Sequence, residues 1–279
     1  MPISLVKSAR ELPEYAPVLG NLIARDLKVK YQSAGLGFAW SLLHPAILLA
    51  IWYLVFNRAG LLKDSMPRYW AYLLSGMLAF QFIQTGILEG AAAVRRNAGI
   101  IRKVYLPIEI LVIAAVTVKL VEFLLQLVVA IALLSLFHRT GTAQFSLTKS
   151  IIVLPGAIGL TYLFVLGVSL PLAAWTVIYR DLEHILSLSL YALFFLSPVF
   201  WSVSMIATAD HFGLVALNPI ASLLNLFHGP LYWGRYPANL AVAGGAIGAW
   251  TLAAAFVAIV LIMGYALFDR AKHVLAEVV

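Results

Sequence analysis

Six long apolar segments constrain this chain more than any other feature of its sequence. A helix needs about 20 apolar residues to cross the hydrocarbon core of a bilayer, and it satisfies its backbone hydrogen bonds internally. We therefore predict an all-α polytopic membrane protein with six transmembrane helices in one domain, residues 38–279. The predicted spans cover about residues 38–57, 69–88, 108–137, 150–176, 185–203 and 240–267.

The composition supports this fold class. Hydrophobic residues make up 63% of the 279 residues and charged residues 11%, whereas a soluble domain is about 45–50% apolar and about 25% charged. The net charge of +7 is attributed to Lys and Arg held at the cytoplasmic face rather than to nucleic-acid binding. If both termini are cytoplasmic, the inner segments carry about twice as many Lys and Arg residues as the outer ones, as the positive-inside rule requires.

Residues 1–37 are predicted to form a cytoplasmic tail and an amphipathic helix in the membrane interface. Within Ala16–Tyr31, apolar residues recur on one side, and Arg25, Lys28 and Lys30 lie on other faces. This pattern is typical of a helix that lies in the interface plane. A solvated cytoplasmic helix is the alternative.

Residues 204–238 are apolar only in short pieces that proline and glycine interrupt. Leu214–Leu217 and Ile220–Phe227 are too short to span a bilayer. We predict a pair of re-entrant half-helices between the fifth and sixth spans, because irregular backbone at membrane depth must be buried in protein or line a wet cavity. In the last span, Gly244 and Gly248 form a GxxxG pattern that permits close helix packing.

No catalytic motif is present. The sequence lacks the P-loop pattern, HExxH, GxSxG and any cluster of carboxylates with metal-ligand spacing. The chain has no cysteine, and we interpret most of its six scattered histidines as loop or interface residues. Lys119 and Glu122 lie well inside a span, three residues apart, so they can form an ion pair. A role along a permeation path is the alternative. We therefore expect no enzyme activity, no metal and no cofactor in this chain.

Two short charged connectors, Val94–Tyr105 and Tyr179–His184, each join two spans. They are either ordinary connecting loops or docking elements for a cytoplasmic partner that supplies energy from ATP.

Aromatic residues gather in and near the first and fifth spans. Rings that stack on the apolar faces of sugars could line a channel, and an aromatic belt at the membrane interface is the alternative. The candidate channel residues are Trp52, Tyr53, Phe56, Tyr191, Phe194 and Trp201.

Sequence motifs along nearly the whole chain resemble one family. Arg25-Asp-Leu-Lys-Val-Lys-Tyr, followed by Gly35-Leu-Gly-Phe-Ala-Trp-Ser-Leu-Leu-His-Pro, is similar to the opening of the ABC-2 permeases that export polysaccharides such as O-antigens, capsules, teichoic acids and galactans. Later pieces agree in order and spacing. They are Asn97-Ala-Gly-Ile-Ile-Arg-Lys-Val-Tyr-Leu-Pro, Tyr179-Arg-Asp-Leu, Ser197-Pro-Val-Phe-Trp and Leu217-Asn-Pro-Ile. His44 departs from the asparagine that is common before this proline.

The resemblance implies a type V exporter fold in the bacterial cytoplasmic membrane. It implies a homodimer beneath which two copies of a separate ATP-binding cassette subunit dock, with ATP and Mg bound by that subunit. Residues 204–232 would form an outside gate. The two charged connectors would be coupling helices, with the residues Arg95, Arg96, Asn97, Arg102, Lys103, Arg180 and Asp181.

The implied substrate is a polysaccharide linked to a polyprenyl diphosphate and moved outward. Arg25, Lys28 and Lys30 could meet the diphosphate of that lipid, or they could only attract anionic lipids. The alternative function in the same class is an ABC-2 exporter of small hydrophobic molecules or drugs. An intramembrane glycan-transferring enzyme and a passive channel are the alternatives from other classes.

Overall fold

The computed structural model describes residues 12–32, 39–58, 69–101, 106–139, 147–179, 181–202, 218–233 and 245–278, and every regular element in these ranges is a helix. The elements are η1 (Leu12–Tyr15), α2 (Ala16–Gln32), α3 (Ala39–Arg58), α4 (Tyr69–Arg96), α5 (Ala98–Ile101), α6 (Ile108–Arg139), α7 (Leu147–Ile178), α8 (Leu182–Leu196), α10 (Pro219–His228), the π-helix η3 (Gly229–Trp233) and α11 (Gly245–Val278). The predicted all-α class is confirmed.

Three helices in the described ranges are long and apolar enough to cross a membrane. They are Tyr69–Arg96 in α4, Ile152–Ile178 in α7 and Ile247–Lys272 in α11. Pro45–Val55 in α3 and Leu182–Leu196 are shorter apolar helices. Helix α6 has 32 residues and carries Lys119 and Glu122 within its apolar sequence. The topology of six spans stays a prediction.

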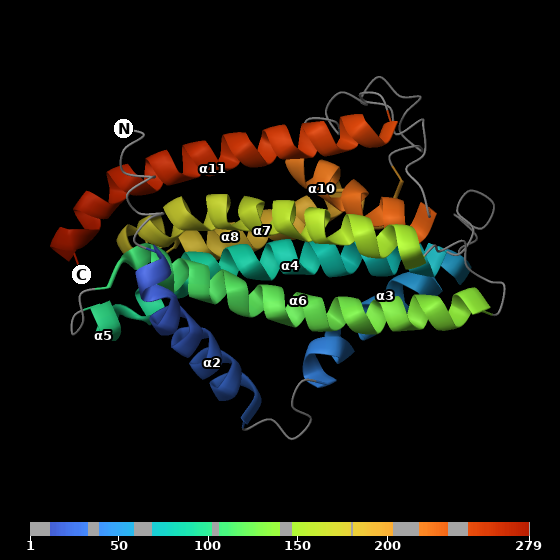
Figure 1. Ribbon diagram of the computed structural model, residues 1–279, viewed down its shortest axis with the longest axis horizontal. Helices are drawn as coiled ribbons and strands as arrows, with labels where there is room; N and C mark the ends of the chain where they lie inside the picture. The colour runs from blue at the N-terminus through green and yellow to red at the C-terminus, as the bar shows by residue number, and fades with distance from the viewer. Residues whose placement is uncertain are drawn as a thin grey trace.

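Helix α4 is the central element of the bundle. It packs against α3, α6, α7, α8 and α10. Helices α4, α6, α7 and α11 run along the long axis of the molecule, and α3 crosses it obliquely (Figure 1). Small residues let its neighbours approach closely. A Cβ atom on Gly90 would lie 2.6 Å from the Ser169 side chain, and one on Gly86 would lie 2.7 Å from Val165. These contacts hold α7 against α4.

Helix α2 lies obliquely across one end of this bundle (Figure 1). Its Leu22 is buried with Ile110, Leu111 and Ala114 of α6, so the apolar side of α2 packs against protein. Helix α5 and the C-terminal end of α11 lie at the same end of the molecule, and α10 lies towards the opposite end (Figure 1).

Three helix ends differ by several residues from the predicted span limits, and one of them is the end of α11, at Val278 rather than near residue 267. Helix α4 continues to Arg96 rather than ending near residue 88, because Ala91, Ala93 and Val94 are fully buried and keep the helix packed on the bundle. Helix α8 ends at Leu196 rather than near residue 203. Ser197 is extended, with φ −100° and ψ 151°, because Pro198 disfavours helical backbone at the residue before it.

The predicted re-entrant pair is described in its second half only. Helix α10 begins at Pro219, and the side chain of Asn218 caps it by accepting a hydrogen bond from the backbone N–H of Ile220. The first half, Leu214–Leu217, lies outside the described residues.

Candidate functional site

A cavity of about 490 Å³ lies between α2, α4 and α6. Basic side chains from all three helices converge on it. Arg25 and Lys30 come from α2, Arg96 from α4 and Lys119 from α6. Its remaining lining residues are Asp26, Val29, Glu89, Asn97, Ala115 and Val118. The site therefore combines cations with hydrogen-bonding groups next to the predicted interface helix.

A second, smaller cavity of about 110 Å³ shares Lys30 and Lys119 with the first. The lining is mostly polar, which is unusual inside a bundle of apolar helices. Its other lining residues are Gln81, Phe82, Thr85, Glu122, Phe123 and Gln126.

A chain of ion pairs connects the two cavities. Lys30 Nζ lies 2.6 Å from Glu122 Oε1, and Lys119 Nζ lies 3.4 Å from Glu122 Oε2. Lys119 Nζ also lies 3.7 Å from Glu89 Oε1, and Glu89 in turn pairs with Arg96. Lys119 and Glu122 therefore form the predicted contact within α6, but Glu122 makes its shorter contact to α2.

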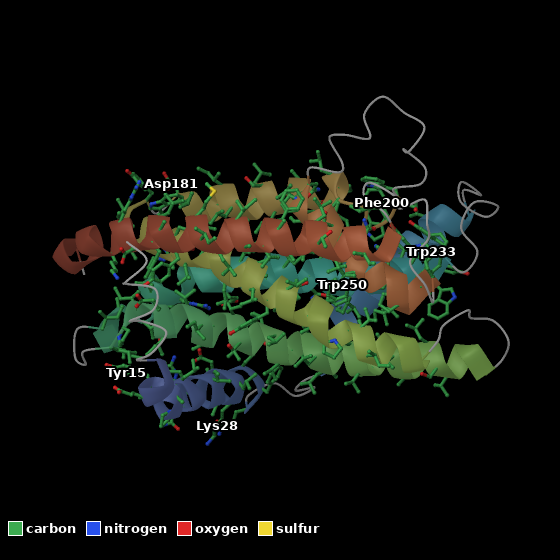
Figure 2. All side chains as sticks on the ribbon, turned by 45° about the horizontal axis from the view of Figure 1, so that its top comes forward. Tyr15, Lys28, Asp181, Phe200, Trp233 and Trp250 are labelled. Atoms are coloured by element: carbon green, nitrogen blue, oxygen red, sulfur yellow. The ribbon has the colours of Figure 1, made fainter. Side chains whose placement is uncertain are left out.

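The residues predicted to meet a lipid head group separate into two sets. Arg25 and Lys30 line the cavity. Lys28 is exposed on the outer side of α2 and points away from the bundle (Figure 2). Burial alone would lower the pKa of Lys30, but the hydrogen bond and the charge of Glu122 outweigh burial, so the pKa lies above its ordinary value. Lys30 is therefore held in its charged form at neutral pH.

Arg25 joins α2 to the end of α4. Its Nη2 donates a hydrogen bond of 3.0 Å to Asn97 Oδ1, and its guanidinium also pairs with Asp26. Asn97 fixes its own side chain by donating to the carbonyl of Ala93 at 2.9 Å. The predicted coupling residue Asn97 thus touches the predicted head-group residue Arg25.

The predicted coupling residues that the structure describes lie at one end of the molecule. Arg95 pairs with Glu183 and so connects the end of α4 to the start of α8. Asp181, just before α8, is exposed at this end, far from Phe200 and Trp233 (Figure 2). Arg102, Lys103 and Arg180 lie outside the described residues.

The predicted docking helix over Val94–Tyr105 is described only as far as Ile101, and its docking role stays a prediction. Val94, Arg95 and Arg96 belong to α4, and α5 is one short turn, Ala98–Ile101. The break falls at Asn97, whose backbone N–H still bonds to the carbonyls of Ala93 and Val94. Arg95 and Arg96 therefore mark the end of a buried helix, whereas Arg102 and Lys103 lie outside the described residues.

The aromatic candidates form a packed cluster between α3 and α8. The ring of Trp52 stacks on Phe200 with centroids 5.4 Å apart, and it lies 6.3 Å from Phe194. Trp201 Nε1 donates to the carbonyl of Phe195 at 3.1 Å. Tyr53 is half-buried against the core, and the Phe56 side chain lies outside the described part.

Tyr191 differs from the other aromatic candidates because 58% of its surface is exposed. Its ring meets Phe195 edge-on at 5.3 Å. Among the candidates whose side chains are described, Tyr191 is thus the best placed to touch a mobile ligand.

Sequence reasoning missed a buried polar cluster around His228. This side chain is 1% exposed, so interpreting the histidines as loop or interface residues is wrong here. Its Nδ1 lies 2.9 Å from Ser75 Oγ, its Nε2 lies 3.0 Å from the carbonyl oxygen of Pro198, and its ring stacks on Tyr72 at 3.9 Å. The one feature of the sequence that relates to this cluster is Gly76, which leaves room for the ring on α4. A Cβ on Gly76 would lie 2.8 Å from the His228 ring.

Comparison with known proteins gives one family. Residues 18–232 match the family model described as ABC-2 type transporter. The chain is 28% identical to the O-antigen export system permease protein RfbA of Myxococcus xanthus over 84% of this chain and 87% of that protein. It is 26% identical to the protein of the same name from Klebsiella pneumoniae, over 91% of this chain and 92% of that protein.

Proposed function

Because this chain belongs to the ABC-2 type transporter family, we propose that it moves a lipid-linked polysaccharide outward across the cytoplasmic membrane. The chain is a transport permease and is not itself an ATPase. One observation carries the proposed substrate class. The relatives that match most of this chain are named as O-antigen export permeases.

The basic cavity supports this substrate class. A polyprenyl diphosphate carries its charge in phosphate groups, which Lys and Arg bind through charge-assisted hydrogen bonds. Arg25 and Lys30 line the cavity from the helix proposed to lie in the interface, so they would meet the head group. Lys28, on the outer side, would attract anionic lipids, an effect of about 1 kcal/mol per basic residue near the surface.

We propose that two copies of the chain form a homodimer and that two ATP-binding subunits dock at the end that carries Arg95 and Asp181. ATP and Mg would be bound by those subunits. Both termini would be cytoplasmic, as the distribution of Lys and Arg suggests. Tyr191 and the cluster around Trp52 would border the path of the glycan.

Reconstitution tests the proposed function. The permease and the ATPase encoded beside it would be placed in vesicles that carry a polyprenyl-diphosphate-linked polysaccharide. We expect ATP-dependent movement of the glycan to the side opposite the ATPase, measured as accessibility to a membrane-impermeant lectin. Movement without ATP would indicate a passive channel. Transport confined to small hydrophobic dyes would indicate the drug exporter.

A charge exchange tests the docking end. Arg95→Glu places two like charges together at Glu183, and we expect about a fivefold loss of glycan transport, since repulsion at a partly exposed position costs about 1 kcal/mol. Adding Glu183→Arg restores the opposite charges and should recover most of the transport. Arg95 is nearly half exposed, so the ion pair itself adds little to stability.

The single variant Glu183→Arg completes this exchange, because it also places two like charges together at the contact. We expect it to lose transport to about the same extent as Arg95→Glu. A double variant that remains as inactive as Arg95→Glu would contradict a role for the contact between α4 and α8.

A further inference from the structure

We propose that the carboxylate of Glu122 occupies a phosphate-binding position, and that Lys119 and Lys30 bind a phosphate group of the ligand when this carboxylate is displaced. The inference rests on the proposed function for the lipid diphosphate, and it adds Lys119 as the buried anchor of the site. The ligand chemistry is a phosphate group on a diphosphate, either at the head of a prenyl lipid or free in solution.

Lys119 lies at the boundary of the two cavities. Its side chain is 11% exposed, and it lines both the larger and the smaller cavity. It stands 11 residues after the first residue of α6, roughly 17 Å along that helix at about 1.5 Å per residue. An ammonium group this far inside an apolar helix is costly to bury, which makes Lys119 a candidate functional position in a membrane protein.

The contacts of Lys119 with its neighbouring carboxylates are longer than typical charge-assisted hydrogen bonds. Its carboxylate neighbours lie at 3.4 Å, in Glu122, and at 3.7 Å, in Glu89. A charge-assisted hydrogen bond to a carboxylate or phosphate is typically about 2.7–2.9 Å long. The ammonium of Lys119 therefore lies between two carboxylates and donates one long hydrogen bond, of 3.4 Å, to Glu122.

Glu122 bridges two ammonium groups in the way that a phosphate would. Its Oε1 lies 2.6 Å from Lys30 and its Oε2 lies 3.4 Å from Lys119. The two lysines come from different helices, 89 residues apart in number. They face one carboxylate that is itself buried, with 10% of its side chain exposed. A phosphate group offers more oxygens and more charge to the same pair.

The charge balance of the site favours an anion over a cation. The basic side chains that line the two cavities are Arg25, Lys30, Arg96 and Lys119, and the carboxylates are Asp26, Glu89 and Glu122. The basic groups exceed the acidic groups by one. When the Glu122 carboxylate moves away from the two lysines, the excess of positive charge around a bound diphosphate increases.

This arrangement gives Glu122 the role of an internal competitor. While its carboxylate bridges the lysines, α2 is tied to α6 through Lys30. Binding of a phosphate would exchange that carboxylate for the ligand, and Lys30 on α2 would then move with the ligand. The neighbouring bond from Arg25 to Asn97 places the end of α4 within reach of the same change.

Binding to the purified complex of permease and ATPase in detergent tests the proposal. The nucleotide sites are first filled with a non-hydrolysable ATP analogue, and affinity is then measured by calorimetry for farnesyl diphosphate and for inorganic pyrophosphate. Tighter binding of the prenyl compound indicates a lipid ligand, and equal binding indicates a free diphosphate. If the wild-type complex binds neither, the proposal is wrong.

Variants of Lys119 and Glu122 should change the affinity for diphosphate in opposite directions. Lys119→Met should weaken binding by about tenfold or more, the size expected for loss of a hydrogen bond to a charged group. Lys119→Arg, which keeps the charge, should bind more tightly than Lys119→Met. Glu122→Gln should strengthen binding by several-fold, because it removes the competing charge. Lys28→Met, on the outer side of α2, is the matched control and should bind like the wild type.

A structural ion pair would give a different pattern. If Glu122 only positions the lysines, Glu122→Gln should weaken binding as Lys119→Met does, and the proposal fails. Unchanged binding in Lys119→Met would also overturn it, even if the complex exports glycan. A complex that exports no glycan but shows the expected pattern would retain the phosphate site and lose the proposed export function.

Discussion

Gly264→Ala should destabilise the protein more than a glycine-to-alanine change at any other described glycine. A Cβ at Gly264 would lie 1.9 Å from the carbonyl oxygen of Gly167 and 2.8 Å from its carbonyl carbon. Both partners are backbone atoms, so no side chain can rotate away. Helices α7 and α11 must separate, and the variant loses the close packing that small residues permit between helices in a membrane.

We expect a loss of about 3 kcal/mol, the upper end of the usual cost of overpacking. The variant should unfold about 6 °C below the wild type, measured as the temperature at which the protein in detergent loses its monodisperse peak. Gly167→Ala should cost less, because a Cβ there would lie 3.1 Å from backbone atoms of Val260 and Leu261.

Gly159→Ala is the matched control, since it lies in α7 and a Cβ there meets nothing within 4 Å. It should be neutral or stabilising by up to about 1 kcal/mol, because alanine favours helix over glycine. Equal unfolding temperatures for Gly264→Ala and Gly159→Ala would contradict the close approach of α7 to α11.

The helices were predictable because their apolar sequences exceed the length that a bilayer requires. The membrane-length helices α4, α7 and α11 follow from that requirement alone. The position at which α7 and α11 contact each other could not be predicted from helix length. The GxxxG pattern in the sequence is formed by Gly244 and Gly248, and Gly244 lies outside the described residues. The close approach of α11 to α7 occurs at Gly264, which has no glycine four residues away.

The candidate site was predictable in part. Arg25 and Lys30 stand out in a short amphipathic helix, and Lys119 and Glu122 stand out as charges inside an apolar span. The pairing of Lys30 with Glu122 joins residues 92 positions apart. Such a contact depends on how α2 packs against α6, and spacing along one helix carries no information about it.

His228 shows why buried polar residues escape sequence reasoning. A histidine beside Gly229 and Pro230 has the local appearance of a loop residue. Its burial arises from two other segments, because Tyr72 and Ser75 lie on α4 and Pro198 lies in the turn after α8. Only tertiary packing brings these partners to the ring.

We expect His228→Ala to be the second strongly destabilised variant. The ring lies 3.9 Å from Tyr72 at an interplanar angle of 5°, and its removal leaves a cavity in the core. Because the carbonyl oxygen of Pro198 only accepts hydrogen bonds, Nε2 of the neutral ring carries the hydrogen and donates it. Nδ1 is then an acceptor 2.9 Å from Ser75 Oγ, whose single hydrogen is shared between Nδ1 and the carbonyl oxygen of Tyr72. Loss of the ring should cost about 3–4 kcal/mol, through the cavity and the lost hydrogen bonds.

His228→Leu separates the two contributions, because leucine fills much of the volume without making the bonds. We expect it to unfold between His228→Ala and the wild type. His184→Ala, at an exposed histidine in the first turn of α8, should unfold with the wild type. If His228→Leu is as stable as the wild type, the hydrogen bonds do not hold the turn after α8, and the ring serves only to fill space.

The polar cluster around His228 also holds the turn that carries the aromatic residue Phe200. The Tyr72 hydroxyl shares its single hydrogen between the carbonyl oxygens of Trp201, at 2.7 Å, and Pro198, at 3.0 Å, and Tyr69 donates to the carbonyl of Phe200. His228 and these tyrosines therefore fix the turn that places Phe200 against Trp52. A loosened turn in His228→Leu should raise solvent access to Trp52, measured as a fluorescence change in that variant that is absent when Trp52 is first replaced by phenylalanine.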